Sequence, residues 1–226
     1  MNKRNPLYKN QGIHSIGCIF TVDEGIIKVL LLKKNDEPYK GKWLLLGGSV
    51  YNNEDTDTAL KREIKEKLNL DYTYIEQFHT FSSPERSQDM RMVAVSYIGL
   101  TDIKKINQLE ISSEYEFFRI DKLPKLAYDH LEILTAGIEA LKHRMIKSTI
   151  ANLFMPDEFT LPELQKVYEC ILGKELDRRN FRRKLLSLDI IETTSKNIKN
   201  SNGAIFYQFK NEDIEEIDIF NLHENV

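Results

Sequence analysis

The fold is decided by the stretch Gly48-Ser-Val-Tyr-Asn-Asn-Glu54-Asp-Thr-Asp-Thr-Ala-Leu-Lys-Arg62-Glu63-Ile-Lys-Glu66-Lys67-Leu-Asn-Leu70. Within it, three aliphatic residues recur at four-residue intervals, namely Leu60, Ile64 and Leu68. This spacing is typical of an amphipathic helix that buries one stripe of side chains. We therefore expect a helix here whose aliphatic stripe faces the core and whose charged side chains remain near the surface.

The charged side chains of this helix support two interpretations. Glu63, Glu66 and Lys67 lie three and four residues apart and share one face. Three carboxylates there would need a hard cation such as Mg²⁺ between them, but Lys67 is a cation itself and opposes metal binding. Glu63–Lys67 and Arg62–Glu66 have the spacing of ion pairs, each worth ~0.2–0.5 kcal/mol. From the helix alone, an ordinary salt-bridged surface helix is the competing reading.

Residues upstream extend the pattern. An apolar segment ends in basic residues near Lys33, and Pro38, Gly41, Trp43 and a Gly-Gly pair ending at Gly48 follow. Glycine allows close approach of the backbone and positive φ. The combined pattern resembles the Nudix family, whose box reads G-x5-E-x7-R-E-U-x-E-E-x-G-U, with U aliphatic, after P-x-x-G-x-W and P-G-G.

The resemblance implies an N-terminal Nudix α/β/α sandwich with a mixed sheet, in which box carboxylates hold metal at the diphosphate of a nucleotide substrate. Here Leu46 replaces a proline of the family, Lys67 an adjacent glutamate and Asn69 a glycine. We therefore expect no catalytic residue, no cofactor and no metal in this degenerate box. The alternative is a metal-dependent Nudix hydrolase of ADP-ribose or a related nucleoside diphosphate derivative, with Mg²⁺ on Glu63 and Glu66. The box residues concerned are Glu54, Arg62, Glu63, Glu66 and Lys67.

Composition is that of a globular protein of one large or two smaller domains, with 226 residues and a net charge of −3. Such a charge does not mark the whole chain for nucleic acid. Cys18 and Cys170 lie far apart without metal-ligand spacing, so both are expected to be free thiols. We expect no signal peptide, no membrane span and a cytoplasmic location.

The chain is expected to be α+β and to divide into a Nudix-like effector-binding domain (1–147), a linker (148–156) and a second domain (157–226). The first contains the box helix, a second helix and a set of β-strands. The strands are expected at Ile13–Thr21, Ile26–Lys33, Tyr74–Phe81, Arg91–Leu100 and Tyr115–Ile120, and the second helix at Leu131–Ile146.

The second domain has the helix boundaries of a helix-turn-helix motif. Thr160 followed by Glu163 predicts a capping box, and Gly173 ends that helix. Another helix begins at Asp177, and its Phe181, Leu185 and Leu188 form the buried stripe. The basic side chains of this second helix are left at the surface, which is the arrangement of a recognition helix.

Two strands predicted at Ile190–Thr194 and Ala204–Lys210 enclose a polar tip, which gives the shape of a wing. Nine Lys/Arg and four Asp/Glu lie between Lys174 and Lys210, a surplus of five positive charges in a chain whose total is negative. Such a surplus suits contact with phosphates; an accessory or protein-contact domain is the alternative. The candidate DNA-binding residues are Arg178, Arg179, Asn180, Arg182, Arg183, Lys184, Lys196 and Lys199.

As a whole, the chain resembles the Nudix-related transcriptional regulators, in which a Nudix-like effector domain precedes a winged helix-turn-helix. Two segments resemble runs of that family, and these are Leu123-Pro-Lys-Leu-Ala-Tyr-Asp-His130 and Asp177-Arg-Arg-Asn-Phe-Arg-Arg-Lys184. The resemblance implies a homodimeric repressor that binds operator DNA and a small metabolite. Most members control NAD metabolism and respond to ADP-ribose or related nucleotides, while one branch responds to a pentose such as arabinose, and both effectors stay open here.

The resemblance also suggests where the effector binds. Arg86 and Arg91 fall at the first and last arginines of the family stretch Arg-Asp-Pro-Arg-Gly-Arg, although the residues between them differ, and Gly47 and Gly48 stand at its Gly-Gly pair. His130 is a candidate base or ligand contact, although a histidine at a helix start is more often structural. Four aromatic residues that could stack on a base are more often part of a sheet core, and these are Tyr72, Tyr74, Phe78 and Phe81.

Overall fold

The contacts in the computed structural model divide the chain into two compact units, residues 1–21 with 28–138 and residues 22–27 with 139–226. No helix among the described residues is both long and apolar enough to cross a membrane. The structure describes residues 11–23, 25–69, 74–87, 90–101, 114–194 and 204–219.

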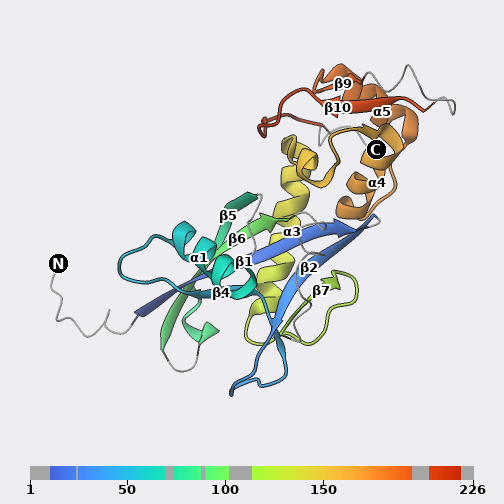
Figure 1. The fold of residues 1–226 in the computed structure, drawn as a ribbon. Coiled ribbons are helices and arrows are strands. Elements are labelled where there is room, and N and C mark those ends of the chain that lie inside the picture. Colours follow the sequence, from blue (N-terminus) through green and yellow to red (C-terminus); the bar gives the residue numbers. More distant parts are fainter. Residues whose placement is uncertain are drawn as a thin grey trace. The chain divides into compact units, whose positions relative to one another are not determined.

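The first unit is built on a mixed sheet that has seven strands among the described residues (Figure 1). Its strands are β1 (Gln11–Asp23), β2 (Ile26–Lys33), β3 (Trp43–Leu44), β4 (Leu46–Ser49), β5 (Tyr74–Phe81), β6 (Arg91–Leu100) and β7 (Tyr115–Arg119). The central strand β1 pairs in parallel with β6 and antiparallel with β4. On either side, β3 and β7 pair with β2, and β5 pairs with β6, all antiparallel.

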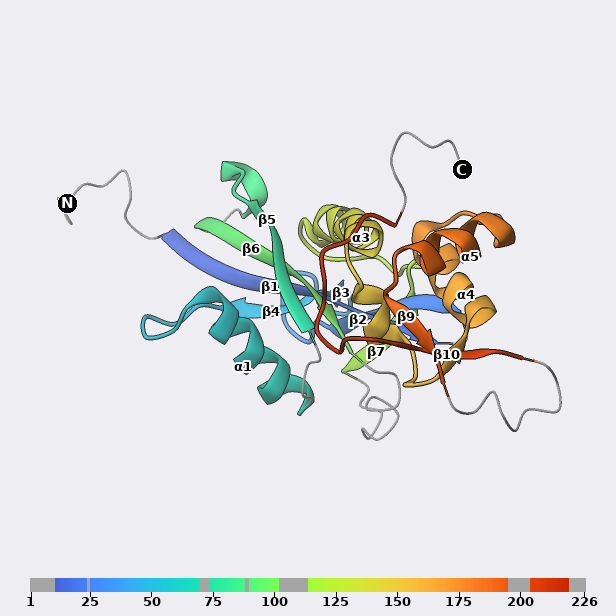
Figure 2. The same cartoon turned by 90° about the horizontal axis from the view of Figure 1, so that it is seen from above.

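Helix α1 (Thr56–Leu68) and the part of α3 (His130–Lys147) that belongs to the first unit lie on opposite faces of this sheet (Figure 2). Alternate residues of β1 serve the two faces, as the period of a strand requires. A Cβ on Gly17 would lie 3.1 Å from Leu60 of α1, whereas a Cβ on Gly137 of α3 would meet the Sγ atom of Cys18 at 2.8 Å. The predicted α/β/α sandwich with a mixed sheet is confirmed.

Helix α1 forms where the aliphatic spacing predicted it. Leu60, Ile64 and Leu68 are 0, 2 and 4% exposed and pack in a cluster with Leu30 and Tyr97. At the N-terminus of the helix, the Asp55 carboxylate accepts a hydrogen bond of 2.7 Å from the main-chain N–H of Thr58. Such a cap stabilises a helix by about 1 kcal/mol.

The C-terminal end of α1 explains one of the departures from the box. Asn69 has a left-handed conformation, with φ 49° and ψ 28°, and its N–H donates to the carbonyl oxygen of Lys65 over 2.9 Å. Helices commonly end with a left-handed residue, usually glycine and sometimes asparagine. The family glycine and Asn69 thus meet the same backbone requirement.

The second unit has a winged helix-turn-helix arrangement, as predicted. The capping box at Thr160 and Glu163 is present, Gly173 ends the first helix with φ 70°, and Asp177 caps the second. Phe181 and Leu185 are buried beneath that second helix. The elements are β8 (Phe159–Thr160), α4 (Leu161–Leu172), α5 (Arg178–Ser187), β9 (Ile191–Thr193) and β10 (Phe206–Phe209), and the strands form a sheet in the order β8-β10-β9.

The segment 148–156, predicted as a linker, belongs to the second unit and contains the 3-10 helix η3 (Ile150–Phe154). Ile150 and Ala151 are fully buried. The N–H of Thr149 donates to the carbonyl oxygen of Glu215 over 2.9 Å, so the segment is tied to the C-terminal part of its own unit.

Candidate functional site

The box carboxylate Glu63 is neutralised by two cations of its own helix. Glu63 is 6% exposed, and its Oε1 and Oε2 atoms lie 2.7 Å from Arg62 Nη1 and Lys67 Nζ, respectively. Lys67 Nζ also donates to the carbonyl oxygen of Gly47 over 2.6 Å. Gly48 leaves room for this cluster, because a Cβ there would lie 2.1 Å from Glu63 Oε1. The predicted pairing of Glu63 with Lys67 is confirmed.

Arg62 joins the box helix to the loop that precedes it. Its Nη2 atom lies 2.7 Å from Glu54 Oε1 and donates to the carbonyl oxygen of Ser49 over 3.0 Å. The hydrogen bonds from Arg62 hold the pKa of Glu54 below its usual value. Arg62 also reaches Glu66 at 3.3 Å, as predicted, and lies 3.9 Å from the centre of the Tyr51 ring.

These residues do not fit a metal centre. Mg²⁺ requires carboxylate or carbonyl oxygens that are free to coordinate it. Both oxygens of Glu63 and those of Glu54 already contact cations, and Lys67 places an ammonium between Glu63 and the Gly47 carbonyl. Across the described ranges, no three acidic, histidine or cysteine side chains form a group that could hold a metal ion.

A cleft of about 670 Å³ opens beside the box, a size suited to a small-molecule ligand. Strands β1 and β4 form one side of it through the pairing of His14 with Ser49 and of Ser15 with Gly48. Three of the predicted effector-binding residues line the cleft, and these are Gly47, Gly48 and Arg86.

The two predicted effector arginines differ in their surroundings. Arg86, in the 3-10 helix η2 (Pro84–Arg86), forms a bidentate pair with Asp129, with 2.9 Å from Nε to Oδ2 and 3.0 Å from Nη2 to Oδ1. Arg91 instead donates to the main-chain carbonyl oxygens of Ser82, Ser83 and Met92, over 2.6 to 3.3 Å, and does not line the cleft. Arg91 thus stabilises a turn, while Arg86 faces the cleft.

His130 lies in the wall of the cleft and is 9% exposed. Its Nδ1 atom accepts a hydrogen bond of 2.9 Å from the N–H of Leu45. The pKa of His130 is lowered to about 4, chiefly by burial; the Asp129 carboxylate raises it, and the Arg86 and His14 charges lower it. His130 is therefore neutral at physiological pH and anchors the start of α3, which agrees with the structural interpretation.

Two tyrosines on the cleft were not singled out from the sequence. Tyr51 and Tyr128 line the cleft and are 54 and 47% exposed. Tyr128 has a φ of 54°, a conformation that residues with a side chain rarely adopt unless their surroundings impose it. Exposed aromatic rings beside a cleft suit stacking on a planar ligand group. The available signal was the position of Tyr128 directly before Asp129 and His130.

The aromatic residues considered from the sequence lie elsewhere. Tyr74, Phe78 and Phe81 are half-buried in β5, and none of them lines the cleft. Tyr72 lies outside the described residues.

Helix α5 presents a basic surface in the second unit. Arg178, Arg179, Arg182 and Arg183 are exposed, and none contacts a carboxylate within the described residues. The side chain of Arg183 donates to Asn180 Oδ1 over 3.0 Å. The same helix carries Asn180, which is exposed, and Lys184, which is half-buried, while Lys196 and Lys199 lie outside the described residues.

Two family profiles match the chain. The NUDIX domain profile matches residues 13–136, more than half of the chain, and the profile of the NrtR DNA-binding winged helix domain matches residues 152–209. The two matches follow one another in the order predicted from the box and the helix-turn-helix signals.

Similar proteins support the same assignment over most of the chain. The "ADPR responsive transcriptional repressor NtrR" of Acinetobacter baylyi is 31% identical over 202 residues, 87% of this chain and 81% of the relative. An "ADP-ribose pyrophosphatase" of Methanocaldococcus jannaschii is 36% identical over 117 residues, 49% of this chain and 68% of the relative.

The solved structure of Shewanella oneidensis NrtR aligns with a TM-score of 0.77 at 28% identity and covers 88% of this chain and 94% of that one. The same protein with a 27mer DNA aligns with a TM-score of 0.73 at 26% identity, covering 88% and 93%. The NUDIX domain of the same protein with ADP ribose aligns with a TM-score of 0.53 at 26% identity and covers 62% of this chain and 94% of that one. The chain belongs to the Nudix family and, within it, to the Nudix-related transcriptional regulators that carry an NrtR winged-helix DNA-binding domain.

Proposed function

We propose that the protein is a transcriptional repressor that binds operator DNA through α5 and ADP-ribose through the cleft beside its Nudix box. The observation that carries the DNA-binding part is the set of four α5 arginines without a carboxylate partner among the described residues. In the first unit, by contrast, Arg62, Arg86 and Arg119 are each paired with an acidic side chain. Unpaired arginines on one helix suit binding to an external polyanion.

The cleft supports a nucleotide-like effector. Its volume lies within the ~300–1,000 Å³ of small-molecule sites, and Tyr51 and Tyr128 offer aromatic surfaces for a base. Arg86 lines the cleft with its guanidinium paired to Asp129, and the Gly47–Gly48 backbone allows a ligand to approach closely. The similarity to a repressor named as ADPR responsive and to a NUDIX domain solved with ADP ribose favours ADP-ribose over a pentose.

Binding is expected to occur without hydrolysis. Lys67 and Arg62 occupy the Glu63 carboxylate that would otherwise be available to a metal ion. The competing function is an ADP-ribose pyrophosphatase. The Methanocaldococcus jannaschii enzyme, which is 36% identical across 49% of this chain, supports this alternative. Turnover of ADP-ribose with Mg²⁺ or Mn²⁺ at ordinary enzyme rates of ~1–10³ s⁻¹ would support that alternative and contradict the repressor-only proposal.

Two measurements test the proposal. Purified protein is first used to select binding sequences from random DNA duplexes, and the selected operator is then assayed by mobility shift with ADP-ribose, NAD or arabinose added. ADP-ribose should release the DNA and raise the Tm, because a ligand that binds only the folded protein stabilises it by mass action. Arg119→Ala is the control for alanine variants of the α5 arginines, since the Arg119 side chain is 41% exposed and paired with Asp121 in the first unit. Release of the operator DNA by arabinose and not by ADP-ribose would show that the effector is a sugar and not a nucleotide.

We also propose that the repressor acts as a homodimer on a palindromic operator. Helix-turn-helix proteins usually place two recognition helices about 34 Å apart, one turn of duplex. Light scattering of the protein with and without operator measures the assembly. A monomer at micromolar concentration under both conditions would contradict this part of the proposal.

A further inference from the structure

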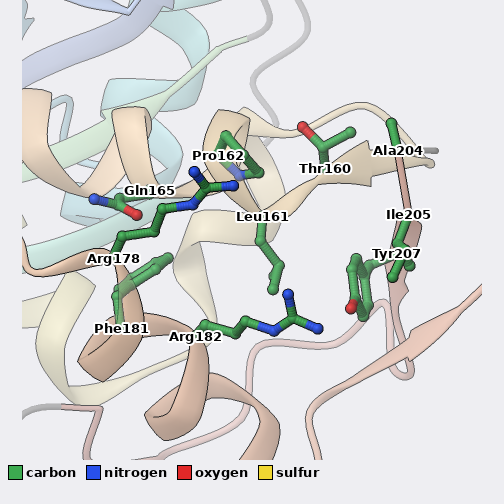
Figure 3. Close-up of a pocket in the computed structure, with 10 residues that line it drawn as sticks. All are labelled: Thr160, Leu161, Pro162, Gln165, Arg178, Phe181, Arg182, Ala204, Ile205 and Tyr207. Carbon is green, nitrogen blue, oxygen red and sulfur yellow. The ribbon is translucent and has the colours of Figure 1, made fainter. Parts of the chain in front are cut away.

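The second unit contains a hollow of about 270 Å³ between α5, the N-terminal end of α4 and strand β10 (Figure 3). Neither the box nor the cleft of the first unit involves it. Among the described residues, its lining includes Leu161, Pro162, Phe181 and Tyr207 beside Arg178 and Arg182.

Only two of the four α5 arginines line this hollow. Arg178 and Arg182 lie four residues apart and therefore on one face of the helix. In Figure 3 the guanidinium of Arg178 extends toward Pro162, and that of Arg182 lies between Leu161 and Tyr207. The other two arginines follow one residue later, about 100° further around the helix. Helix α5 thus carries two pairs of arginines that face different surroundings.

The hollow combines positive charge with an apolar floor. Leu161, Phe181 and Tyr207 are 7, 2 and 5% exposed and form that floor. The acidic residues nearby are already engaged: Glu163 accepts hydrogen bonds from Thr160, and Asp177 accepts one from the N–H of Asn180. A simple inorganic anion would use only the arginines. A group with an anionic and an apolar part would use both the arginines and the floor.

We infer that this hollow seats a sugar–phosphate of the DNA backbone, held by Arg178 and Arg182, while Arg179 and Arg183 contact base edges. The inference rests on the proposed DNA-binding function and divides the α5 arginines by role. Phosphate contacts fix the position of a protein on the duplex without reading its sequence, whereas base contacts carry specificity. The first pair therefore supplies affinity for any duplex, and the second pair supplies preference for the operator.

The test compares four alanine variants of the full chain on two duplexes, the selected operator and a scrambled sequence of the same composition. Binding is measured by fluorescence anisotropy from about 50 to about 200 mM salt. Arg178→Ala and Arg182→Ala should weaken binding to both duplexes by the same factor and lower the salt slope by about one each. Arg179→Ala and Arg183→Ala should reduce the preference for the operator by roughly 5- to 150-fold.

Circular dichroism establishes that each variant is folded, and Arg178→Lys and Arg182→Lys should keep most of the salt slope because they keep the charge. The inference is overturned if either hollow variant changes the operator preference, since its arginine would then contact bases and not the backbone. It is equally overturned if either hollow variant leaves binding to both duplexes unchanged, since that arginine would then not contact DNA. It is also overturned if neither Arg179→Ala nor Arg183→Ala reduces the preference. Failure of the wild-type protein to bind any duplex would instead refute the proposed function itself, and the inference with it.

Discussion

Acidification should destabilise the first unit through His130. The buried imidazole has a pKa of about 4 in the folded protein, against an ordinary value of 6.5 in an unfolded chain. Folding therefore favours the neutral form. The stability that this group contributes is fully present above about pH 6.5 and is lost as the pH falls toward 4. Protonation would also remove the Nδ1 acceptor from the Leu45 N–H.

The two pKa values set the magnitude of the effect. At pH 5 the unfolded histidine is almost fully protonated and the folded one almost fully neutral. With 1.36 kcal/mol for each unit of pKa, the free energy of unfolding should fall by about 2 kcal/mol between pH 7 and pH 5 from this residue alone. The lowered pKa of His14, which burial causes first and Arg86 second, acts in the same direction.

His130→Asn isolates the contribution of His130. An asparagine oxygen can accept the Leu45 N–H in place of Nδ1 but does not titrate. The single tryptophan of the chain, Trp43, lies in β3 and packs against Phe118, so its fluorescence reports unfolding of the first unit in urea. The wild-type protein should lose about 2 kcal/mol more than the variant between pH 7 and pH 5. Equal losses in the two proteins would refute the reasoning.

Three further changes test the box and the cleft. Lys67→Glu should raise Mn²⁺ affinity roughly tenfold or more, measured by electron paramagnetic resonance against Lys67→Gln, because the charge beside the carboxylates reverses; equal affinity in both variants would contradict this. Gly47→Ala should cost roughly 1–3 kcal/mol in urea unfolding, because its Cβ would lie 2.4 Å from the main-chain oxygen of Ser15; an unchanged midpoint would argue against the close β1–β4 approach. Arg86→Leu should cost roughly 1–3 kcal/mol by leaving the half-buried Asp129 without its cation, and adding Asp129→Asn should recover most of it; no recovery would show that the loss arises elsewhere.

The sequence predicted those elements whose signals are local. Both ends of α4 and the start of α5 follow from Thr160, Gly173 and Asp177, each of which acts on main-chain groups within a few residues. The buried face of α1 follows from the four-residue spacing of its aliphatic side chains, which needs no knowledge of the partner strands.

The cleft could not be predicted from such local signals, because the residues that line it come from segments far apart in the sequence. His14 reaches Ser49 only through the β1–β4 pairing, while Arg86 comes from η2 and Tyr128 from the turn before α3. The same limit applies to Arg91, which the family resemblance placed with Arg86 at the effector site. Its partners are main-chain carbonyl oxygens of a turn, and such partners leave no trace in residue type.

The left-handed end of α1 separates two kinds of information that a motif position can carry. Asn69 stands where the family has glycine, and asparagine enters this conformation more readily than other residues with a side chain. The replacement therefore keeps the end of the helix and leaves the charge of the box as it was. Lys67 keeps the helix and changes the charge. A search for active hydrolases that gives Asn69 and Lys67 equal weight would treat Asn69, which preserves the backbone conformation, as evidence of lost catalysis.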